Sequence, residues 1–358
     1  MKANRVPSDP TIIRVGPVGL QQMTTLEPLS PREGKELYLN DRAGDLAVST
    51  HRSHGYRIER FCEWCEANNL DNLNNLTGRH IHRYKITRKS EVDSTNTVKS
   101  HLDTLRVFLR YMRDVDAVGD DIPEKVNSPS LNPGEGVATD TLDAERADDI
   151  LDQLRRFEWA SRRHVVLELL WATSIRNGTL RSFDLEDYYT QEAYIEARHR
   201  KQTDTPLKNK QRGERAISLT SHTCDVIDDY IEVNRNRVRD EYDRKPLITT
   251  KRGRISTNTV RAYVYRCTRP CEWSGDCPHG RERDSCEAVQ SRMSGSKCPD
   301  SVGSHAVRRG SITHHLNENT PKEVVSDRAD VGVDVLEKHY DARSEKEKME
   351  QRRDYLPD

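Results

Sequence analysis

The sequence has few aromatic side chains and no long apolar run. Aromatic residues make up 6% of the 358 residues, and phenylalanine occurs only four times. No stretch approaches the roughly 20 consecutive apolar residues that a membrane-spanning helix needs. No apolar segment follows a basic start, as it would in a secretory leader. The sequence therefore predicts a soluble, cytoplasmic protein with no membrane contact.

An excess of positive charge is also missing. The chain has 58 basic and 59 acidic residues, so its net charge is −1. A protein that binds nucleic acid is commonly basic, and this balance weighs against such a partner. The distribution of charge matters more than its sum, however, because basic clusters occur at 198–215, 251–270 and 305–309.

The eight cysteines are not spaced as a disulfide framework, which a chain of this length does not need. Cys62 and Cys65 lie in a helical pattern and are predicted to be core residues. The segment 267–298 is rich in proline and glycine and lacks a helical pattern. Two interpretations stay open for it: reduced cysteines in a packed loop, or a structural zinc site. The zinc ligands would be four of Cys271, Cys277, Cys286, Cys298 and His279.

The apolar pattern predicts a mainly α fold with a small β-sheet, divided into two domains. Ser30 followed by Pro31 predicts the start of the first of about four helices. In the second domain, strands at 192–200 and 215–220 flank a basic loop. The predicted divisions are a loosely ordered arm at 1–27, a helical domain at 28–118, a Pro- and Gly-rich linker at 119–140, and a second domain at 141–358 that contains a Cys-rich insertion at 267–300.

Four motifs follow one another in the second domain. The stretch SHAVRR predicts a helix that Ser304 caps, with His305 and Arg308 on one face of its first turns. Free N–H groups at a helix start, together with an imidazole and a guanidinium, favour binding of a phosphate. The other motifs are TSIRNGTL with Arg176, TPLKNKQRGERAISL with Lys208 and Lys210, and VLEKHYDARS with Tyr340.

In this order and spacing, the motifs resemble those of the tyrosine recombinase (phage integrase) family, and more closely those of its haloarchaeal members. The resemblance begins at about residue 28 and spans nearly all the rest of the chain. It implies a helical core-binding (SAM-like) domain followed by a catalytic domain that breaks and rejoins DNA. The implied activity is site-specific recombination through a 3′-phosphotyrosine intermediate.

The resemblance implies roles for the cationic residues. Arg176 and Arg308 would grip the nonbridging phosphate oxygens as planar forks. His305 would donate to a phosphate oxygen or handle the proton of the nucleophile. No cofactor is required for this chemistry, because guanidinium groups supply the positive charge.

The resemblance also implies a nucleophile and a general acid. Tyr340 would attack the phosphorus atom, and its rival Tyr355 does not keep the family spacing. A lysine on the loop between the two strands would protonate the leaving 5′ oxygen. Lys208 is the preferred candidate, and Lys210 is the alternative.

Two positions depart from the family pattern. The acidic residue expected three positions after Arg176 is Thr179. The histidine or tryptophan expected nine positions before the nucleophile is Val331, in the sequence ADV where LGH is usual. A valine cannot donate to phosphate. Either another histidine substitutes or the site has one donor fewer, and the candidates are His314, His315 and His339.

The implied partner is double-stranded DNA, bound by a homotetramer on two DNA sites. A helix at about 344–355 would dock on a neighbouring copy. Two alternative functions share the fold. One is a sequence-specific DNA-binding protein with impaired catalysis, which the valine at 331 favours. The other is strand relaxation like that of a type IB topoisomerase.

Overall fold

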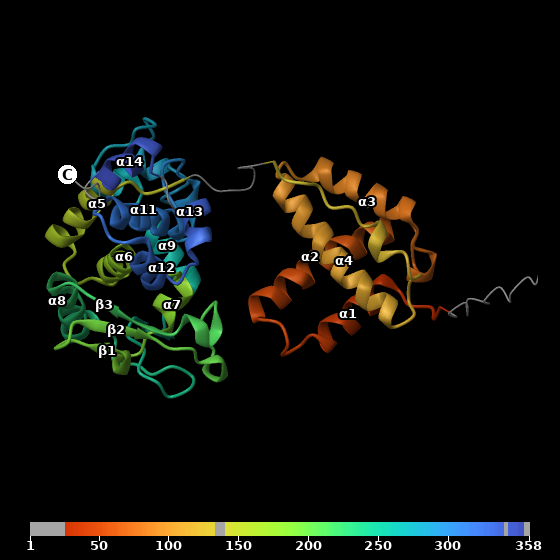
Figure 1. The fold of residues 1–358 in the computed structure, drawn as a ribbon, viewed down its shortest axis with the longest axis horizontal. Coiled ribbons are helices and arrows are strands. Elements are labelled where there is room, and N and C mark those ends of the chain that lie inside the picture. The colour runs from red at the N-terminus through yellow and green to blue at the C-terminus, as the bar shows by residue number, and fades with distance from the viewer. Residues whose placement is uncertain (1–25, 133–139, 340–342, 354–358) are drawn as a thin grey trace, which may run out of the picture. The chain divides into compact units, whose positions relative to one another are not determined.

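The computed structural model describes residues 26–132, 140–339 and 343–353, and the chain divides into two compact units, 1–137 and 138–358. Figure 1 draws the first unit in red to orange-yellow and the second from yellow through green to blue. Each unit has its own buried apolar core. In the described ranges, no helix is both long enough and apolar enough to cross a membrane.

Four α-helices are described in the N-terminal unit: α1 (Pro31–Asp41), α2 (Val48–Ala67), α3 (Gly78–Glu91) and α4 (Thr95–Asp114). Ser30 caps α1 as predicted, in a capping box with Glu33. The predicted core positions Cys62 and Cys65 are also confirmed, because both are 0% exposed, and an apolar stripe of α4 is at most 2% exposed. That stripe consists of Leu102, Leu105, Leu109 and Met112.

The first part of the predicted linker 119–140 is packed into the N-terminal core. Ile122 and Val126 are 5% and 1% exposed and flank a short 3₁₀ turn at Pro123–Lys125. Burying one such side chain stabilises a fold by about 1.5–3 kcal/mol. The turn residues made this segment look like a linker, whereas its two apolar side chains attach it to the helical unit.

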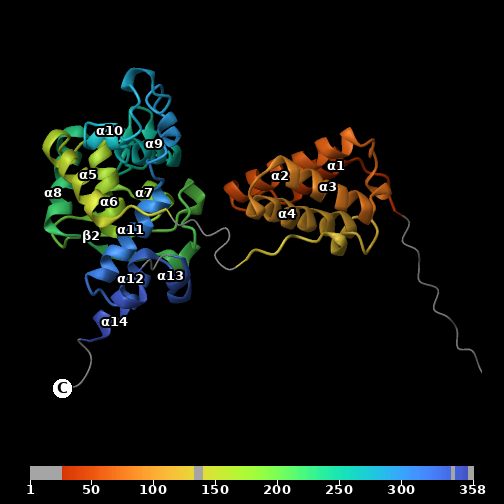
Figure 2. The same cartoon turned by 90° about the horizontal axis from the view of Figure 1, so that it is seen from above.

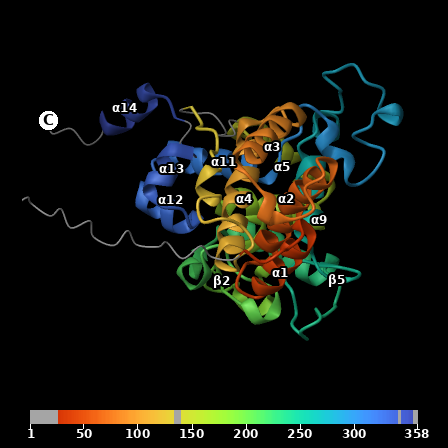
Figure 3. The same ribbon diagram turned by 90° about the vertical axis from the view of Figure 1, so that its right-hand side faces the viewer.

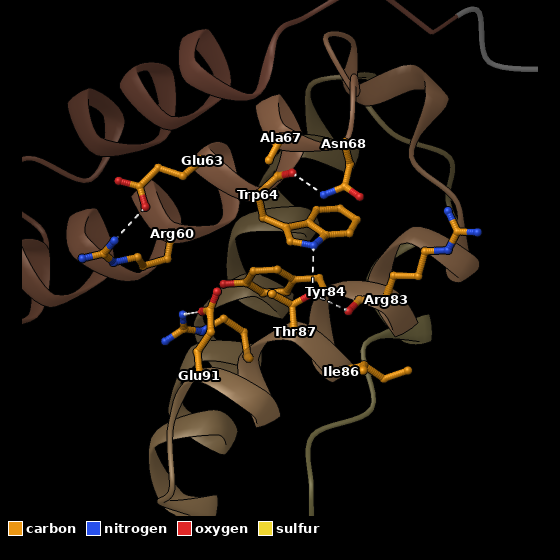
Figure 4. A pocket seen from close by; sticks show the side chains of 11 residues that line it. Arg60, Glu63, Trp64, Ala67, Asn68, Arg83, Tyr84, Ile86, Thr87 and Glu91 are labelled. Atoms are coloured by element: carbon orange, nitrogen blue, oxygen red, sulfur yellow. Dashed lines mark hydrogen bonds and ion pairs between the residues drawn. The ribbon is translucent and has the colours of Figure 1, made fainter.

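A hollow of about 550 Å³ lies between α2 and α3 of the N-terminal unit (Figure 4). The Trp64 and Tyr84 rings line it, and the Trp64 indole N–H donates to Thr87 Oγ1 at 3.2 Å. Ion pairs join Arg60 to Glu63 and Arg88 to Glu91 at its rim. Each pair neutralises its own charges, and Arg83, which also lines the hollow, adds one positive charge to it.

The C-terminal unit is built around one buried helix, α6 (Arg162–Thr173). Its sequence VVLELLW has apolar residues at nearly every position, so it is covered on all sides. The helices packed on it are α5 (Ala144–Phe157), α7 (Asn177–Ser182), α8 (Ser221–Asp229), α9 (Thr257–Cys267) and α11 (Ser304–Asn317). Beyond α11 follow α12 (Lys322–Ala329), α13 (Val333–His339) and α14 (Glu345–Arg353), and α14 stands apart from the other two in Figures 2 and 3.

The small β-sheet is confirmed. It is antiparallel, with the order β1 (Tyr188–Tyr189), β2 (Tyr194–Ala197) and β3 (Arg215–Ser218). Ile195 and Ile217 are partners in the β2–β3 register, and both point into the core. A separate hairpin joins β4 (Thr249–Thr250) to β5 (Gly253–Arg254). The sheet matters for the site because β2 and β3 hold the ends of the basic loop.

The chain enters the C-terminal unit along α11. The Leu142 N–H donates to the Ala306 carbonyl at 3.1 Å, and the Arg309 guanidinium donates to the Asp140 carbonyl and carboxylate. Gly310 faces the same segment so closely that a Cβ atom there would lie 1.7 Å from the Leu142 carbonyl oxygen. Only glycine permits this approach, so residues 140–142 and α11 form one packed element.

Candidate active site

Arg308 lies on α11 and is 1% exposed. Its Nη1 atom donates to the carbonyl oxygens of Ser174 and Ala329, the latter at 2.8 Å. Ser174 ends α6 in a left-handed conformation, and Ala329 is the last residue of α12. Two chain turns therefore hold this guanidinium through its Nη1 atom.

Arg176 lies two residues after Ser174, directly before α7. Its Nη1 atom forms an ion pair with Asp330 Oδ2 at 2.7 Å, and its side chain is 22% exposed. Asp330 directly follows Ala329. The turns 174–176 and 329–331 therefore hold both predicted arginines, and the two motifs meet in space.

His305 lies in the first turn of α11, three residues before Arg308, as the sequence predicts. The imidazole is at the surface, but partial loss of hydration and the charges of nearby arginines, first Arg308, lower the pKa of His305 below its ordinary value. The prediction that Ser304 caps this helix is wrong. Gly303 is the capping residue, and Ser304 Oγ instead accepts a hydrogen bond from Asn177 at 3.0 Å, which joins the start of α7 to the start of α11.

The basic loop between β2 and β3 is tied to the same site. Leu207 is 4% exposed and anchors the loop in the core, whereas Lys208 and Lys210 are both exposed. Between them, Asn209 Nδ2 donates to Asp330 Oδ1 at 2.7 Å. Both lysines therefore flank a residue that contacts the partner of Arg176, and the structure does not separate Lys208 from Lys210.

Val331 is a core residue. It is 7% exposed and belongs to a small apolar cluster with Ile312, Leu316, Val325, Ala329 and Leu336. Of the histidines considered as substitutes, His315 contacts the Ala172 carbonyl through Nε2 at 3.3 Å, two helical turns beyond Arg308. His314 stacks on Trp171. Neither contact directs a ring toward the two arginines, and nothing is described for the side chain of His339.

The predicted nucleophile Tyr340 and its rival Tyr355 lie outside the described residues. Helix α13 is described as far as His339, directly before Tyr340. The described part of the site therefore consists of its cations and of the groups that hold them.

The Cys-rich insertion leaves the body of the unit beside α9 and α10 (Pro270–Trp273), as Figures 2 and 3 show. Within the described residues, no three cysteine, histidine or acidic side chains lie close enough to hold a metal ion. The cluster that does form is ionic. The Glu272 carboxylate is 9% exposed and pairs with four arginines: Arg163, Arg266, Arg269 and Arg283. Zinc binding by Cys271, Cys277, Cys286 and Cys298 stays a prediction from the sequence.

Sequence reasoning missed Asp330 and Asn209, which connect Arg176 to the lysine loop. A signal was present, because Asp330 occupies the position where the family motif has glycine. The structure explains that preference: residue 330 is left-handed, with φ 54° and ψ 59°.

Comparisons with known proteins bear on the fold. No family model matches the chain. A protein of Caldanaerobacter subterraneus subsp. tengcongensis, named as a tyrosine recombinase, is 24% identical over 213 residues, which are 59% of this chain and 67% of that protein. The structure of the Tn1549 transposon integrase with a circular intermediate DNA has a TM-score of 0.63 at 13% identity, covering 92% of this chain and 100% of that one. For a lambda integrase dimer bound to a core site, the TM-score is 0.62 at 13% identity, with coverage of 89% and 79%.

The chain has the tyrosine recombinase fold. The predicted fold class, a helical domain followed by a mainly helical catalytic domain with a small sheet, is confirmed by these neighbours. At 13% identity the likeness establishes the fold, so the roles of individual residues in this tyrosine recombinase fold depend on the contacts around Arg176, Arg308 and Asp330.

Proposed function

We propose that the chain is a site-specific recombinase that cuts and rejoins double-stranded DNA through a 3′-phosphotyrosine on Tyr340. The observation that carries the proposal is the joint anchoring of Arg176 and Arg308 by the turns 174–176 and 329–331. Guanidinium groups held in this way bind a phosphate with little further loss of conformational entropy. Such preorganised cations stabilise the charge that gathers on phosphate oxygens during in-line attack.

The chemistry then assigns a task to each group. The tyrosine oxygen bonds to phosphorus while the bond from phosphorus to the 5′ oxygen breaks, and the leaving oxygen takes a proton from a lysine of the β2–β3 loop. The lowered pKa keeps His305 neutral near pH 7, so its ring can accept the tyrosine proton or donate an N–H to the phosphate. Rejoining reverses these steps, because the phosphotyrosine keeps the bond energy.

Structures of similar fold support the partner and the assembly. The Tn1549 and lambda integrases were each solved with DNA, and one lambda structure is a tetramer on a Holliday junction. By analogy, this chain would act as a homotetramer on two DNA sites in the cytoplasm. The charged helix α14, which stands apart from α12 and α13, is the element that would dock on a neighbouring copy.

One observation favours a second function. With Val331 buried in an apolar cluster, position 331 supplies no hydrogen-bond donor where the family pattern has one. This favours a sequence-specific DNA-binding protein with impaired cleavage. The two functions differ in whether a covalent bond to DNA forms.

The deciding experiment traps covalent adducts on duplexes with a random segment, so the target sequence is selected by the protein itself. The full chain is incubated with nicked forms of these duplexes, from which a short fragment diffuses away after cleavage, so that the adduct cannot reverse. Adducts that survive denaturing detergent are isolated and their DNA is sequenced. We expect adducts from the wild type and from Tyr355→Phe, enriched in one sequence, and none from Tyr340→Phe.

Each other outcome has a distinct meaning. DNA that is retained without any covalent adduct would establish the impaired DNA-binding function. Adducts with no sequence enrichment would indicate relaxation of the type IB topoisomerase kind. If adducts are lost in Tyr355→Phe and kept in Tyr340→Phe, Tyr355 is the nucleophile.

A further inference from the structure

Asp330 occupies a backbone position that most residues avoid. It follows α12 with φ 54° and ψ 59°, where a side chain is normally disfavoured and glycine is the usual choice. The N–H groups of Asp330 and Val331 close this turn on the carbonyls of Asp327 and Ser326 at 3.0 Å each. Aspartate is one of the few residues other than glycine that adopt this conformation, and here it places a carboxylate where glycine would offer no side chain.

Both oxygens of that carboxylate are engaged, each by a different chain segment. Oδ2 accepts from Arg176 Nη1 at 2.7 Å, and Oδ1 accepts from Asn209 Nδ2 at 2.7 Å. The Asp330 side chain is 10% exposed. Gly213 leaves room for it, because a Cβ atom at that position would lie 3.2 Å from Oδ2. The turn before α7, the β2–β3 loop and the α12–α13 turn thus converge on one side chain.

Electrostatics indicates that this contact orients Arg176. A negative charge beside an arginine that must attract a phosphate weakens that attraction, so affinity for DNA alone would favour a neutral residue at position 330. A carboxylate bound at one nitrogen of a guanidinium also fixes its plane, which an uncharged neighbour does poorly. The position three residues after Arg176, where the family pattern predicts an acid, holds the buried Thr179. Asp330 is the acid that reaches Arg176 instead.

We infer that Asp330 is a positioning residue for DNA cleavage, which sets Arg176 and the lysine loop in one arrangement through its two oxygens. The inference rests on the proposed recombinase function. Arg176 acts on the nonbridging oxygens and the lysine on the leaving oxygen, so a common anchor places both at the same phosphate. Loss of the anchor therefore affects two separable steps of catalysis.

The test uses the full chain and the nicked duplex recovered from the adduct selection. Asp330→Gly removes the carboxylate without straining the left-handed backbone. Asn209→Ala removes only the contact to the loop, and Asp334→Asn removes a charge from an exposed position of α13 as the control. Two quantities are measured: the single-turnover rate of adduct formation at saturating DNA, and the Kd for DNA in a Tyr340→Phe background.

We expect Asp330→Gly to slow adduct formation roughly tenfold to a hundredfold, as the loss of one or two charge-assisted hydrogen bonds predicts. Its Kd should stay the same or fall, because a negative charge has been removed near DNA. Asp334→Asn should match the wild type. If Asp330→Gly forms the adduct faster than the wild type, the carboxylate acts as an inhibitory counterion. If its Kd for DNA is higher and its Tm is lower, the role of the carboxylate is structural. Either result, or a wild-type rate, overturns the inference.

A second substrate distinguishes the contact of Asp330 with Arg176 from its contact with Asn209. Sulfur in place of the bridging 5′ oxygen leaves without protonation, so it compensates for a misplaced lysine and not for a misplaced arginine. Asn209→Ala should regain nearly the wild-type rate on this duplex, and Asp330→Gly should regain only part of it. If Asn209→Ala stays slow, the loop contact has no positioning role. If the wild type forms no adduct on any duplex, the proposed function itself fails, which is a different result from a slow variant.

Discussion

The Nη1 atom of Arg308 lies 2.8 Å from the carbonyl oxygen of Ala329, at the end of helix α12. The same atom donates to the carbonyl of Ser174, at the end of helix α6. This buried arginine therefore joins the two turns that hold Arg176, in addition to any contact with phosphate. The guanidinium group is planar and can donate hydrogen bonds to several acceptors at once.

We expect Arg308→Lys to lower the rate of adduct formation by about a hundredfold or more, since an ammonium cannot reproduce the directions of the guanidinium N–H groups. The measurement is single-turnover adduct formation on the selected duplex. Arg292→Lys, at an exposed position in the insertion, is the matched control and should be unaffected. Near-normal cleavage by Arg308→Lys would remove Arg308 from the site.

The lysine that acts as general acid can be identified by the same sulfur-bridged duplex. We expect Lys208→Ala to cleave ordinary DNA slowly and the sulfur-bridged DNA at nearly the wild-type rate, because a thiolate leaves without a proton. Arg176→Ala should stay slow on both substrates. Rescue of Lys210→Ala in place of Lys208→Ala would assign the role to Lys210. Rescue of neither lysine would place the acid outside this loop.

A buried histidine should make the N-terminal unit sensitive to acid. His101 on α4 is 4% exposed, and burial, followed by the charge of Arg88, lowers the pKa of His101 to about 4. An unfolded histidine titrates near 6.5, so the unfolded chain binds the proton first as the pH falls. The contribution of neutral His101 to the free energy of unfolding is complete above about pH 6.5 and is lost between there and about pH 4.

Hydrogen exchange of α4 peptides at pH 7.5 and pH 5 should show this loss in the wild type. His101→Leu should flatten the dependence, and His82→Leu, at an exposed position of α3, should leave it unchanged. An identical pH dependence for the wild type and His101→Leu would show that another group is responsible.

The folded structure of the insertion should depend on the charge of Glu272. Although burial opposes it, the neighbouring arginines, first Arg266, lower the pKa of Glu272, so the carboxylate is charged at neutral pH. Glu272→Gln leaves four arginines around a neutral amide, and breaking a buried ion cluster costs about 3–5 kcal/mol. We expect faster proteolytic cutting within 274–300 and a lower Tm. Glu287→Gln, in an exposed pair with Lys297, is the control and should change neither quantity.

Zinc in the insertion is tested separately. If Cys271, Cys277, Cys286 and Cys298 hold zinc, purified protein should contain about one zinc per chain, and Cys286→Ser should lose it. Elemental analysis measures this directly. Protein that is well folded and active with no zinc would leave the reduced-cysteine interpretation and the Glu272 cluster as the account of this loop.

The sequence predicted the parts of the site that follow from local patterns. Helix starts, apolar stripes and the spacing of arginine and histidine depend on neighbours within a few residues, so His305 and Arg308 could be placed in the first turns of one helix. The contacts of Asp330 could not be predicted, because they join segments 121 and 154 residues apart in the chain. The predicted cap of α11 was wrong for a similar reason, because it depends on a residue far away in the chain. The hydroxyl oxygen of Tyr265, from α9, lies 3.0 Å from the position that a Cβ atom of Gly303 would occupy.

The close approach of Gly310 to Leu142 has a mechanical consequence. Because residues 140–142 are fastened to the helix that carries His305 and Arg308, a displacement of this entering segment moves α11 with it. The position of the helix that carries His305 and Arg308 therefore depends on the segment that enters the unit as well as on α6.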